Sequence, residues 1–164
     1  MNTNAHKASF TWLPLVISIG ITLAIGGVAS FFTVPQIPTW YTFLQKPAFN
    51  PPNWLFGPVW TLLYILIGIS AYLVWQKRDE SLVYINAKYT YIFQLLFNFS
   101  WSIVFFGLHQ IFMALTIIMA LWLSILVTIF YFGKLSRTAA WLLVPYLLWV
   151  SFASLLNYYI YLLN

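Results

Sequence analysis

Five long apolar runs dominate this chain of 164 residues and restrict the environment in which it can fold. They cover residues 12–32, 54–76, 86–107, 112–132 and 139–163. Each run is close to the length of about 20 residues that an α-helix needs to cross a bilayer. Charged residues make up 5% of the chain, whereas they make up about a quarter of a soluble domain. The sequence therefore predicts an all-α integral membrane protein, a single membrane domain over residues 1–164 built as a five-transmembrane-helix bundle.

Two other interpretations of the runs fit the sequence less well. A transmembrane β-strand needs about ten residues that alternate between apolar and polar, but these runs are apolar all round. A cleaved signal peptide has an apolar segment of about 7–15 residues before its cleavage site. The first run, residues 12–32, is longer and no clear cleavage site follows it. We therefore expect a retained first helix.

The basic residues predict the orientation in the membrane. They stand at or near the ends of the runs, and the more basic face is expected to be cytoplasmic. The residues on that face are Lys7, Lys77, Arg78, Lys88, Lys134 and Arg137. The opposite face has Lys46 alone. We therefore expect a cytoplasmic N-terminus and a C-terminus outside. The basic loop face favours the inner membrane of a bacterium, and a mitochondrial or outer membrane stays open. Topology accounts for the net charge of +5, so no nucleic-acid partner is expected.

The middle parts of the runs contain few polar groups. Both carboxylates, Asp79 and Glu80, lie in a loop, which argues against proton-coupled transport and carboxylate-based catalysis. Gln94, Asn98 and Asn157 remain, together with hydroxyls and tryptophan N–H groups. A pocket built from such groups suits a large, flat and mostly apolar ligand. No catalytic residue and no required cofactor is expected, although an enzymatic role stays open.

Neither a metal site nor specific haem ligation is expected. The chain has no cysteine, His6 is in the polar N-terminal tail, and His109 is in a short turn. Met113 and Met119 are better explained as apolar filling of the core. A tetrapyrrole would therefore be held by stacking on aromatic rings rather than by an axial ligand.

The segment 40–54 is the one long stretch that is neither plainly transmembrane nor plainly polar. Three prolines, five aromatic residues and two asparagines in it predict a stiff, non-helical loop. It lies between the first two spans, where a lid over a binding cavity would sit. We assign residues 33–53 to a proline-rich lid loop on the non-cytoplasmic side.

Helical spacing gathers small or aromatic residues on one face of several spans. The small residues of the first span have two alternative explanations. They allow close helix packing, or they make room for a ligand. Each aromatic residue taken singly is well explained as core filling or as an interfacial anchor. Several spans with Trp or Tyr, two of them beside an Asn, favour an aromatic-lined pocket. The stripes are Gly20, Ala24, Gly27 and Phe31; Trp60, Tyr64, Gly68, Ala71 and Trp75; Phe97, Trp101 and Phe105 with Asn98; and Tyr146, Trp149, Phe152, Ala153 and Leu156 with Asn157.

Several sequence blocks in a fixed order resemble a known family. The blocks are Trp40-Tyr41, Leu44-Gln45-Lys46-Pro47, Asn50-Pro51-Pro52-Asn53-Trp54, Pro58-Val59-Trp60, Leu63-Tyr64, Asn98, Trp101, Phe105-Phe106-Gly107, residues 144–149, Phe152-Ala153 and residues 156–159. They extend over residues 40–159 and resemble the TspO/MBR family. This is the family of tryptophan-rich sensory proteins and translocator proteins, also described as peripheral-type benzodiazepine receptors.

The resemblance implies a five-helix bundle in a lipid bilayer, commonly a homodimer, with a cavity under the loop after the first helix. Family members bind porphyrins, and many bind sterols and isoquinoline or benzodiazepine ligands. The implied function is a membrane receptor, sensor or carrier for porphyrin-type tetrapyrroles such as protoporphyrin IX. Light-dependent porphyrin breakdown and sterol or lipid transport are the alternatives. By position, the family's pocket maps onto Gly20, Ala24, Phe49, Trp54, Trp101, Trp149, Phe152, Ala153 and Leu156, with polar contacts from Asn98 and Asn157.

The chain departs from the family pattern at two places. Many relatives have Trp at the position of Phe49, and pocket tryptophans are implicated in porphyrin breakdown, so Phe49 argues against that activity here. Animal relatives have an Arg after the residues that match Tyr158 and Tyr159, within a proposed cholesterol motif. No basic residue follows this pair here, so that motif is incomplete.

Overall fold

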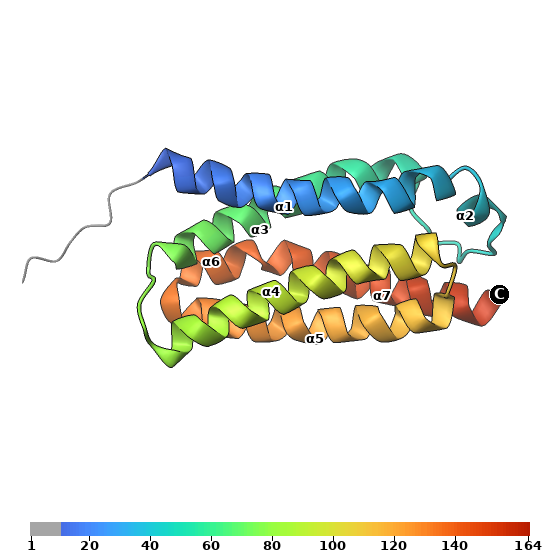
Figure 1. Cartoon of the computed structure of the whole chain (residues 1–164). Helices are drawn as coiled ribbons and strands as arrows, with labels where there is room; N and C mark the ends of the chain where they lie inside the picture. The colour runs from blue at the N-terminus through green and yellow to red at the C-terminus, as the bar shows by residue number, and fades with distance from the viewer. Residues whose placement is uncertain (1–10) are drawn as a thin grey trace, which may run out of the picture.

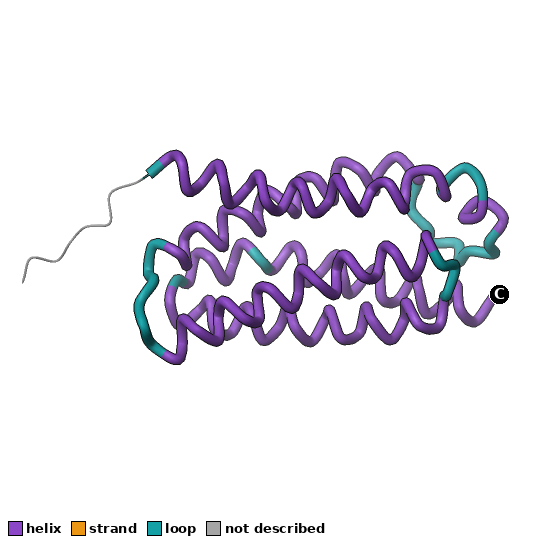
Figure 2. Tube along the Cα trace, in the orientation of Figure 1, coloured by secondary structure: helices purple, strands orange, loops and turns teal. Residues whose placement is uncertain are grey.

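The computed structural model describes residues 11–164, and the regular secondary structure of this part is entirely helical. The long helices run along one elongated bundle (Figure 1), and loops join them at its two ends (Figure 2). In chain order the helices are α1 (Trp12–Thr33), η1 (Val34–Gln36), α2 (Trp40–Phe43), η2 (Asn53–Leu55), α3 (Phe56–Trp75), α4 (Leu82–Ser102), η3 (Ile103–Gly107), α5 (Ile111–Leu135), α6 (Arg137–Leu142) and α7 (Val144–Leu163).

Five helical segments are long and apolar enough to cross a membrane. They cover Trp12–Gln36, Asn53–Trp75, Leu82–Gly107, Ile111–Leu135 and Arg137–Leu163. This confirms the all-α bundle with five membrane helices that the sequence predicts. The length and apolar composition of the segments indicate an integral, multi-pass membrane protein.

Consecutive spans are antiparallel, and α1 packs along α3, α4 along α5, and α7 along α5. Lys46 lies at the end of the bundle that carries the C-terminus, and the other described Lys and Arg residues belong to the opposite end. Lys7, which also enters the orientation argument, lies outside the described residues. The cytoplasmic N-terminus and the choice of membrane stay predictions.

The third span begins at Leu82 rather than at residue 86, where its apolar run begins. Ser81 caps this helix, because its hydroxyl oxygen accepts a hydrogen bond from the Tyr84 amide at 3.2 Å. Asp79 in turn accepts hydrogen bonds from the Ser81 amide and hydroxyl, at 3.0 and 2.6 Å. Such a cap satisfies an amide that the helix itself leaves free. Polar residues therefore set a helix start that the apolar run does not reveal.

α1 and α3 approach each other closely at Gly68. A Cβ atom at this position would lie 2.7 Å from the Ile19 Cα and 2.9 Å from the Thr22 hydroxyl oxygen. Two hydroxyls also bond across the contact. Ser18 donates to the Gly68 carbonyl at 2.8 Å, and Thr22 donates to the Tyr64 carbonyl at 2.7 Å. Small residues and interhelical hydrogen bonds are the means by which helices associate in lipid.

Two spans depart from a regular α-helix. The fifth is broken at Leu143, before Pro145, because proline has no amide hydrogen and its ring clashes with the carbonyl one turn earlier. The third ends in the π-helical turn η3, where the Leu108 amide bonds the Ile103 carbonyl at 2.9 Å. Phe105 and Phe106, adjacent in this turn, are both buried.

The segment 40–54 is not wholly non-helical as predicted, because it begins with the single turn α2 and ends in η2. Side chains within this loop between α1 and α3 stabilise its conformation. Tyr41 is buried, and its hydroxyl donates a hydrogen bond to the Asn50 side-chain oxygen at 2.8 Å. Burial raises the pKa of the Tyr41 hydroxyl to about 12, so this group stays protonated at neutral pH. The Lys46 ammonium donates to the Tyr41 and Leu44 carbonyls at 2.7 Å each. These bonds satisfy carbonyls at the end of α2.

The loop is also attached to the ends of other helices. The Gln45 amide donates to the Asn164 side-chain oxygen, and the Asn164 side-chain nitrogen donates to the Gln45 carbonyl, both at 3.0 Å. The Trp40 ring stacks on the His109 ring, with centroids 4.2 Å apart. The loop is therefore joined both to the end of α7 and to the turn between α4 and α5.

Replacing Gly68 with Ala is expected to lower the free energy of unfolding by about 1–3 kcal/mol, because the added methyl group meets the Ile19 backbone. The unfolding midpoint of the purified protein in detergent measures this effect. Gly20→Ala is the matched control, since nothing lies within 4 Å of a Cβ there and alanine is the better helix former. Equal midpoints for the two variants would contradict the close approach.

Asn164→Ala is expected to speed amide exchange in residues 44–50 about fivefold. It removes two hydrogen bonds, each of which contributes about 0.5–1.5 kcal/mol. Hydrogen–deuterium exchange with mass spectrometry measures the change, and Asn53→Ala, at an exposed asparagine near the same loop, is the control. Exchange at the wild-type rate in Asn164→Ala would show that this pair of bonds does not hold the loop.

Candidate functional site

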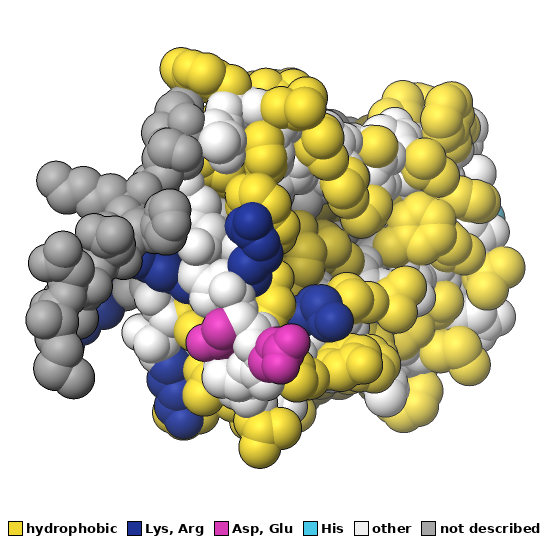
Figure 3. Space-filling model, turned by 60° about the vertical axis from the view of Figure 1, so that its left-hand side comes forward, with side chains coloured by type: hydrophobic (Ala, Val, Ile, Leu, Met, Phe, Trp, Pro, Cys, Tyr) yellow, Lys and Arg dark blue, Asp and Glu magenta, His cyan; other side chains and the backbone are white. Residues whose placement is uncertain are grey.

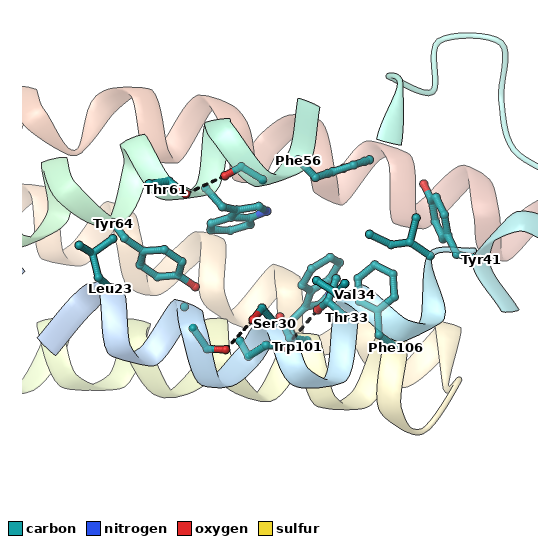
Figure 4. A pocket seen from close by; sticks show the side chains of 17 residues that line it. Leu23, Ser30, Thr33, Val34, Tyr41, Phe56, Thr61, Tyr64, Trp101 and Phe106 are labelled. Atoms are coloured by element: carbon teal, nitrogen blue, oxygen red, sulfur yellow. Dashed lines mark hydrogen bonds between the residues drawn. The ribbon is translucent and has the colours of Figure 1, made fainter. Parts of the chain in front are cut away.

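A cavity of about 330 Å³ lies between α1, α3 and the C-terminal part of the third span, and it reaches the loop after α1 (Figure 4). None of its lining residues is charged. Residues 11–164 contain no group of three His, Asp or Glu side chains that could hold a metal ion. The lining residues that shape it are Gly26, Tyr41, Phe56, Trp60, Tyr64, Trp101 and Phe106.

Aromatic rings from different helices form most of the walls. Trp60 and Tyr64 are one turn apart on α3, with ring centroids 5.6 Å apart. Trp101 on α4 stacks on Phe105 at 5.3 Å and meets the Phe106 ring edge-on at 5.9 Å. Figure 4 shows Trp101 and Phe106 across the space from the α3 side. A flat ligand between these walls would find ring faces or edges on both sides.

α1 contributes the residues of the lining that have small side chains. Gly26 lies against the Tyr64 ring, and a Cβ atom at Gly26 would overlap that ring. The Ser30 and Thr33 hydroxyls donate to carbonyls of α1 at 2.6 and 3.2 Å, and the Thr61 hydroxyl donates to a carbonyl of α3 at 2.9 Å. Because these donors are already bonded within their own helices, the surface offered to a ligand is largely apolar.

A buried hydrogen-bond chain holds the Tyr64 wall in place. The Tyr64 hydroxyl donates to the Asn98 side-chain oxygen at 2.6 Å, and the Asn98 side-chain nitrogen donates to the Tyr146 hydroxyl at 3.0 Å. The chain joins α3, α4 and α7, and all three residues are buried. A buried polar network of this kind rigidifies the groups that it joins.

The Trp101 wall is positioned in a similar way. Its indole N–H donates to the Asn157 side-chain oxygen at 3.1 Å, and the Asn157 side-chain nitrogen donates to the Ile111 carbonyl at 3.1 Å. The polar edge of the indole is therefore bonded to α7, and its ring is left to line the cavity.

Behind the cavity, the Trp149 indole N–H is buried and has no hydrogen-bond partner among the described residues. Its ring centroid lies 6.1 Å from that of Phe56, which lines the cavity, and 5.5 Å from that of Phe152. An unpaired buried donor costs about 1–3 kcal/mol. This N–H is therefore a donor that a ligand reaching past Phe56 would satisfy.

The structure brings part of the sequence-based site to the cavity. Trp101 lines it, whereas Asn98 and Asn157 hold its walls. Trp149 and Phe152 form an aromatic layer behind it. Two further residues of the fifth span, Ala153 and Leu156, pack in the core of the bundle rather than against the cavity.

Four residues of the sequence-based site lie away from the cavity. Gly20 and Ala24 are exposed on the outer face of α1, because the opposite face of that helix packs on α3. Phe49 is 42% exposed and packs edge-on against Phe152, with centroids 6.2 Å apart. Trp54 is 71% exposed. None of the four lines the cavity.

Several lining residues were not selected from the sequence. Trp60 and Tyr64 belong to the aromatic stripe that helical spacing predicts in the second span. They are not among the pocket positions that the family resemblance implies. Gly26 stands beside Gly27 of the small-residue stripe, and its contact with the Tyr64 ring is visible only in the structure. Phe106 lies in a π-helical turn, which no regular helical period predicts.

The TspO/MBR family model matches residues 18–163. Tryptophan-rich protein TspO of Archaeoglobus fulgidus is 51% identical over 154 residues, which cover 93% of this chain and 97% of that protein. Tryptophan-rich sensory protein of Cereibacter sphaeroides is 37% identical over 135 residues, covering 82% and 83%. Translocator protein of Homo sapiens is 36% identical over 154 residues, covering 90% and 88%. With these matches along most of its length, the chain belongs to the TspO/MBR family.

Proposed function

We propose that this protein is a membrane receptor or sensor that binds a porphyrin-type tetrapyrrole in the cavity between α1, α3 and α4. Its relatives include proteins named as a tryptophan-rich sensory protein and a translocator protein, which support a receptor or sensor role. We further propose that it works as a homodimer, as the family resemblance implies. The shape and the chemistry of the cavity support a flat, mostly apolar ligand of this class.

The observation that carries the proposal is an aromatic cavity without a charged lining residue. Trp60 and Tyr64 line it on α3, and Trp101 and Phe106 line it from the third span. Aromatic pairs contribute about 0.5–1.5 kcal/mol beyond the burial of their area. A porphyrin macrocycle is flat and mostly apolar, so it can use these walls while its carboxylates reach water at the loop end.

A macrocycle requires this cavity to widen. Its volume of about 330 Å³ is near the lower end of the range of about 300–1,000 Å³ for small-molecule sites. Phe56 is the first residue of α3 and stands between the cavity and the Trp149 ring. Movement of Phe56 would let the unpaired Trp149 N–H donate to the ligand. Because Tyr41 of the loop also lines the cavity, the ligand would alter the loop, which is a change that a sensor can transmit.

Light-dependent porphyrin breakdown and sterol or lipid transport would use the same cavity. Breakdown would remove the Soret band under illumination faster than an unrelated Trp-rich membrane protein does. Transport would give flux into proteoliposomes above that of protein-free vesicles. We expect binding without either activity, and a positive result in one of these assays would replace the receptor assignment.

Trp60→Leu is expected to weaken protoporphyrin IX binding about tenfold, because about 1.4 kcal/mol of ring contact is lost. The measurement is the quenching of intrinsic tryptophan fluorescence during titration in detergent. Trp141→Leu is the matched control, since Trp141 is 72% exposed on α6 and does not line the cavity. The control is expected to bind within about twofold of wild type.

Two further variants decide which residues form the ligand site. Trp54→Leu should leave the affinity within about twofold, because Trp54 is exposed and outside the cavity. A larger loss for Trp54→Leu than for Trp60→Leu would move the site to the outer surface near η2. Wild-type affinity after replacing both Trp60 and Trp101 would remove the cavity as the binding site.

A further inference from the structure

A second cavity, of about 470 Å³, lies at the opposite end of the bundle from the first. We call it the basic-end groove. It is lined by the N-terminal half of α1, the end of α3, the first turns of α4, and Phe132 of α5. Ile17 and Ile21 line it and are 51% and 52% exposed. Because exposed side chains of a membrane span form part of its lining, the groove opens sideways toward lipid.

The apolar part of the groove suits a hydrocarbon chain. Its apolar lining comes from Leu13, Pro14 and Ile21 of α1 and from Val74 and Trp75 of α3. Water in the hydrocarbon layer would have few polar partners here, whereas an acyl chain regains the dispersion contacts that an empty groove forfeits. The bilayer supplies such chains at high concentration. The groove wall therefore favours a lipid tail as occupant.

The polar part of the groove carries an unneutralised positive charge. Lys88 lines the groove, and its ammonium lies 5.4 Å from the centroid of the Tyr89 ring. The described carboxylates, Asp79 and Glu80, belong to the loop before α4, and Asp79 already accepts two bonds from Ser81. Within residues 11–164, no ion pair involves Lys88. An ammonium without a carboxylate partner is free to bind an external anion.

A second cation lies over a ring of the groove, and two tyrosines belong to its lining. The Arg78 guanidinium is 4.0 Å from the centroid of Trp75, a groove residue. Tyr84 and Tyr91 also line the groove, and their hydroxyls have no hydrogen-bond partner within the described part of the chain. Figure 3 shows Lys and Arg side chains around this end of the bundle, next to apolar surface. Cations and free hydroxyls together match the oxygens of a phosphate.

The height of these groups along the helix also fits a lipid headgroup. Lys88 follows the first residue of α4, Leu82, by about 9 Å at a rise of about 1.5 Å per residue. A lysine side chain can extend from such a depth to the membrane interface. Trp75 and Tyr84 are of the residue types that concentrate at that level.

We propose that the basic-end groove binds an anionic phospholipid of the surrounding bilayer. One acyl chain lies between α1 and α4, and the phosphate contacts Lys88 and Arg78. A zwitterionic phospholipid has the same chains and the same phosphate, but its added cationic group is repelled by these two residues. The groove therefore selects the lipid by the net charge of its headgroup.

The test is native mass spectrometry of the purified protein in detergent, titrated with dioleoyl phosphatidylglycerol or dioleoyl phosphatidylcholine. Wild type should bind phosphatidylglycerol more tightly. Lys88→Gln should weaken that binding about fivefold, as expected for one interfacial cation, and leave phosphatidylcholine unchanged. Lys134→Gln makes the same charge change at the same end, but Lys134 lies over the Phe130 and Tyr131 rings and not in the groove. This control should keep the preference.

Ile21→Trp fills the apolar part of the groove and should remove the tightly bound phosphatidylglycerol. A cooperative thermal unfolding transition in each variant shows that it is folded. Equal affinity of wild type for the two lipids, or equal loss in Lys88→Gln and Lys134→Gln, would overturn the proposal. So would glycerol phosphate binding as tightly as the whole lipid, or a dimer that only Ile21→Trp dissociates. The last result would assign the groove to a second copy of the chain.

Discussion

The close contact between α1 and α3 at Gly68 is the interaction on which the rest of this structure depends. Apolar surface does not drive helices together in lipid, so close packing and interhelical hydrogen bonds must hold them. Gly68 lets the α1 backbone approach, and hydroxyls of Ser18 and Thr22 bond to carbonyls of α3. On α1, the aromatic cavity is lined by residues after Thr22 and the basic-end groove by residues before it. One contact near the middle of the helices thus separates two sites of different character.

Amide side chains connect the aromatic cavity to the rest of the bundle. Asn98 joins Tyr64 to Tyr146, and Asn157 joins Trp101 to the first residue of α5. Both asparagines are buried and uncharged, so each can pair its donor and its acceptor without the cost of burying an ion. The Tyr64 and Trp101 rings are therefore connected to α7 by hydrogen bonds, although α7 itself contributes no lining residue. This arrangement leaves the cavity surface free of charged side chains.

The five spans could be predicted because a membrane helix must satisfy its own backbone hydrogen bonds, which makes length and apolar composition sufficient signals. The start of α4 at Leu82 was missed because a Ser81 cap, and not an apolar residue, sets it. Trp101, Asn98 and Asn157 were predicted residues that the structure places in or beside the cavity walls. Gly20 and Ala24 share a helical stripe but face outward, since a stripe indicates a common face without indicating which neighbour covers it.

The sequence by itself determined the membrane environment, the helical class, the number of spans and the family, because these follow from local composition and from residues in a fixed order. Only the tertiary structure decided which face of α1 meets α3, through the approach at Gly68. It also decided that Trp60 forms a cavity wall while Trp54 remains exposed. These outcomes depend on how rigid helices rotate and cross to satisfy all their contacts at once, and no segment of the chain contains that information alone.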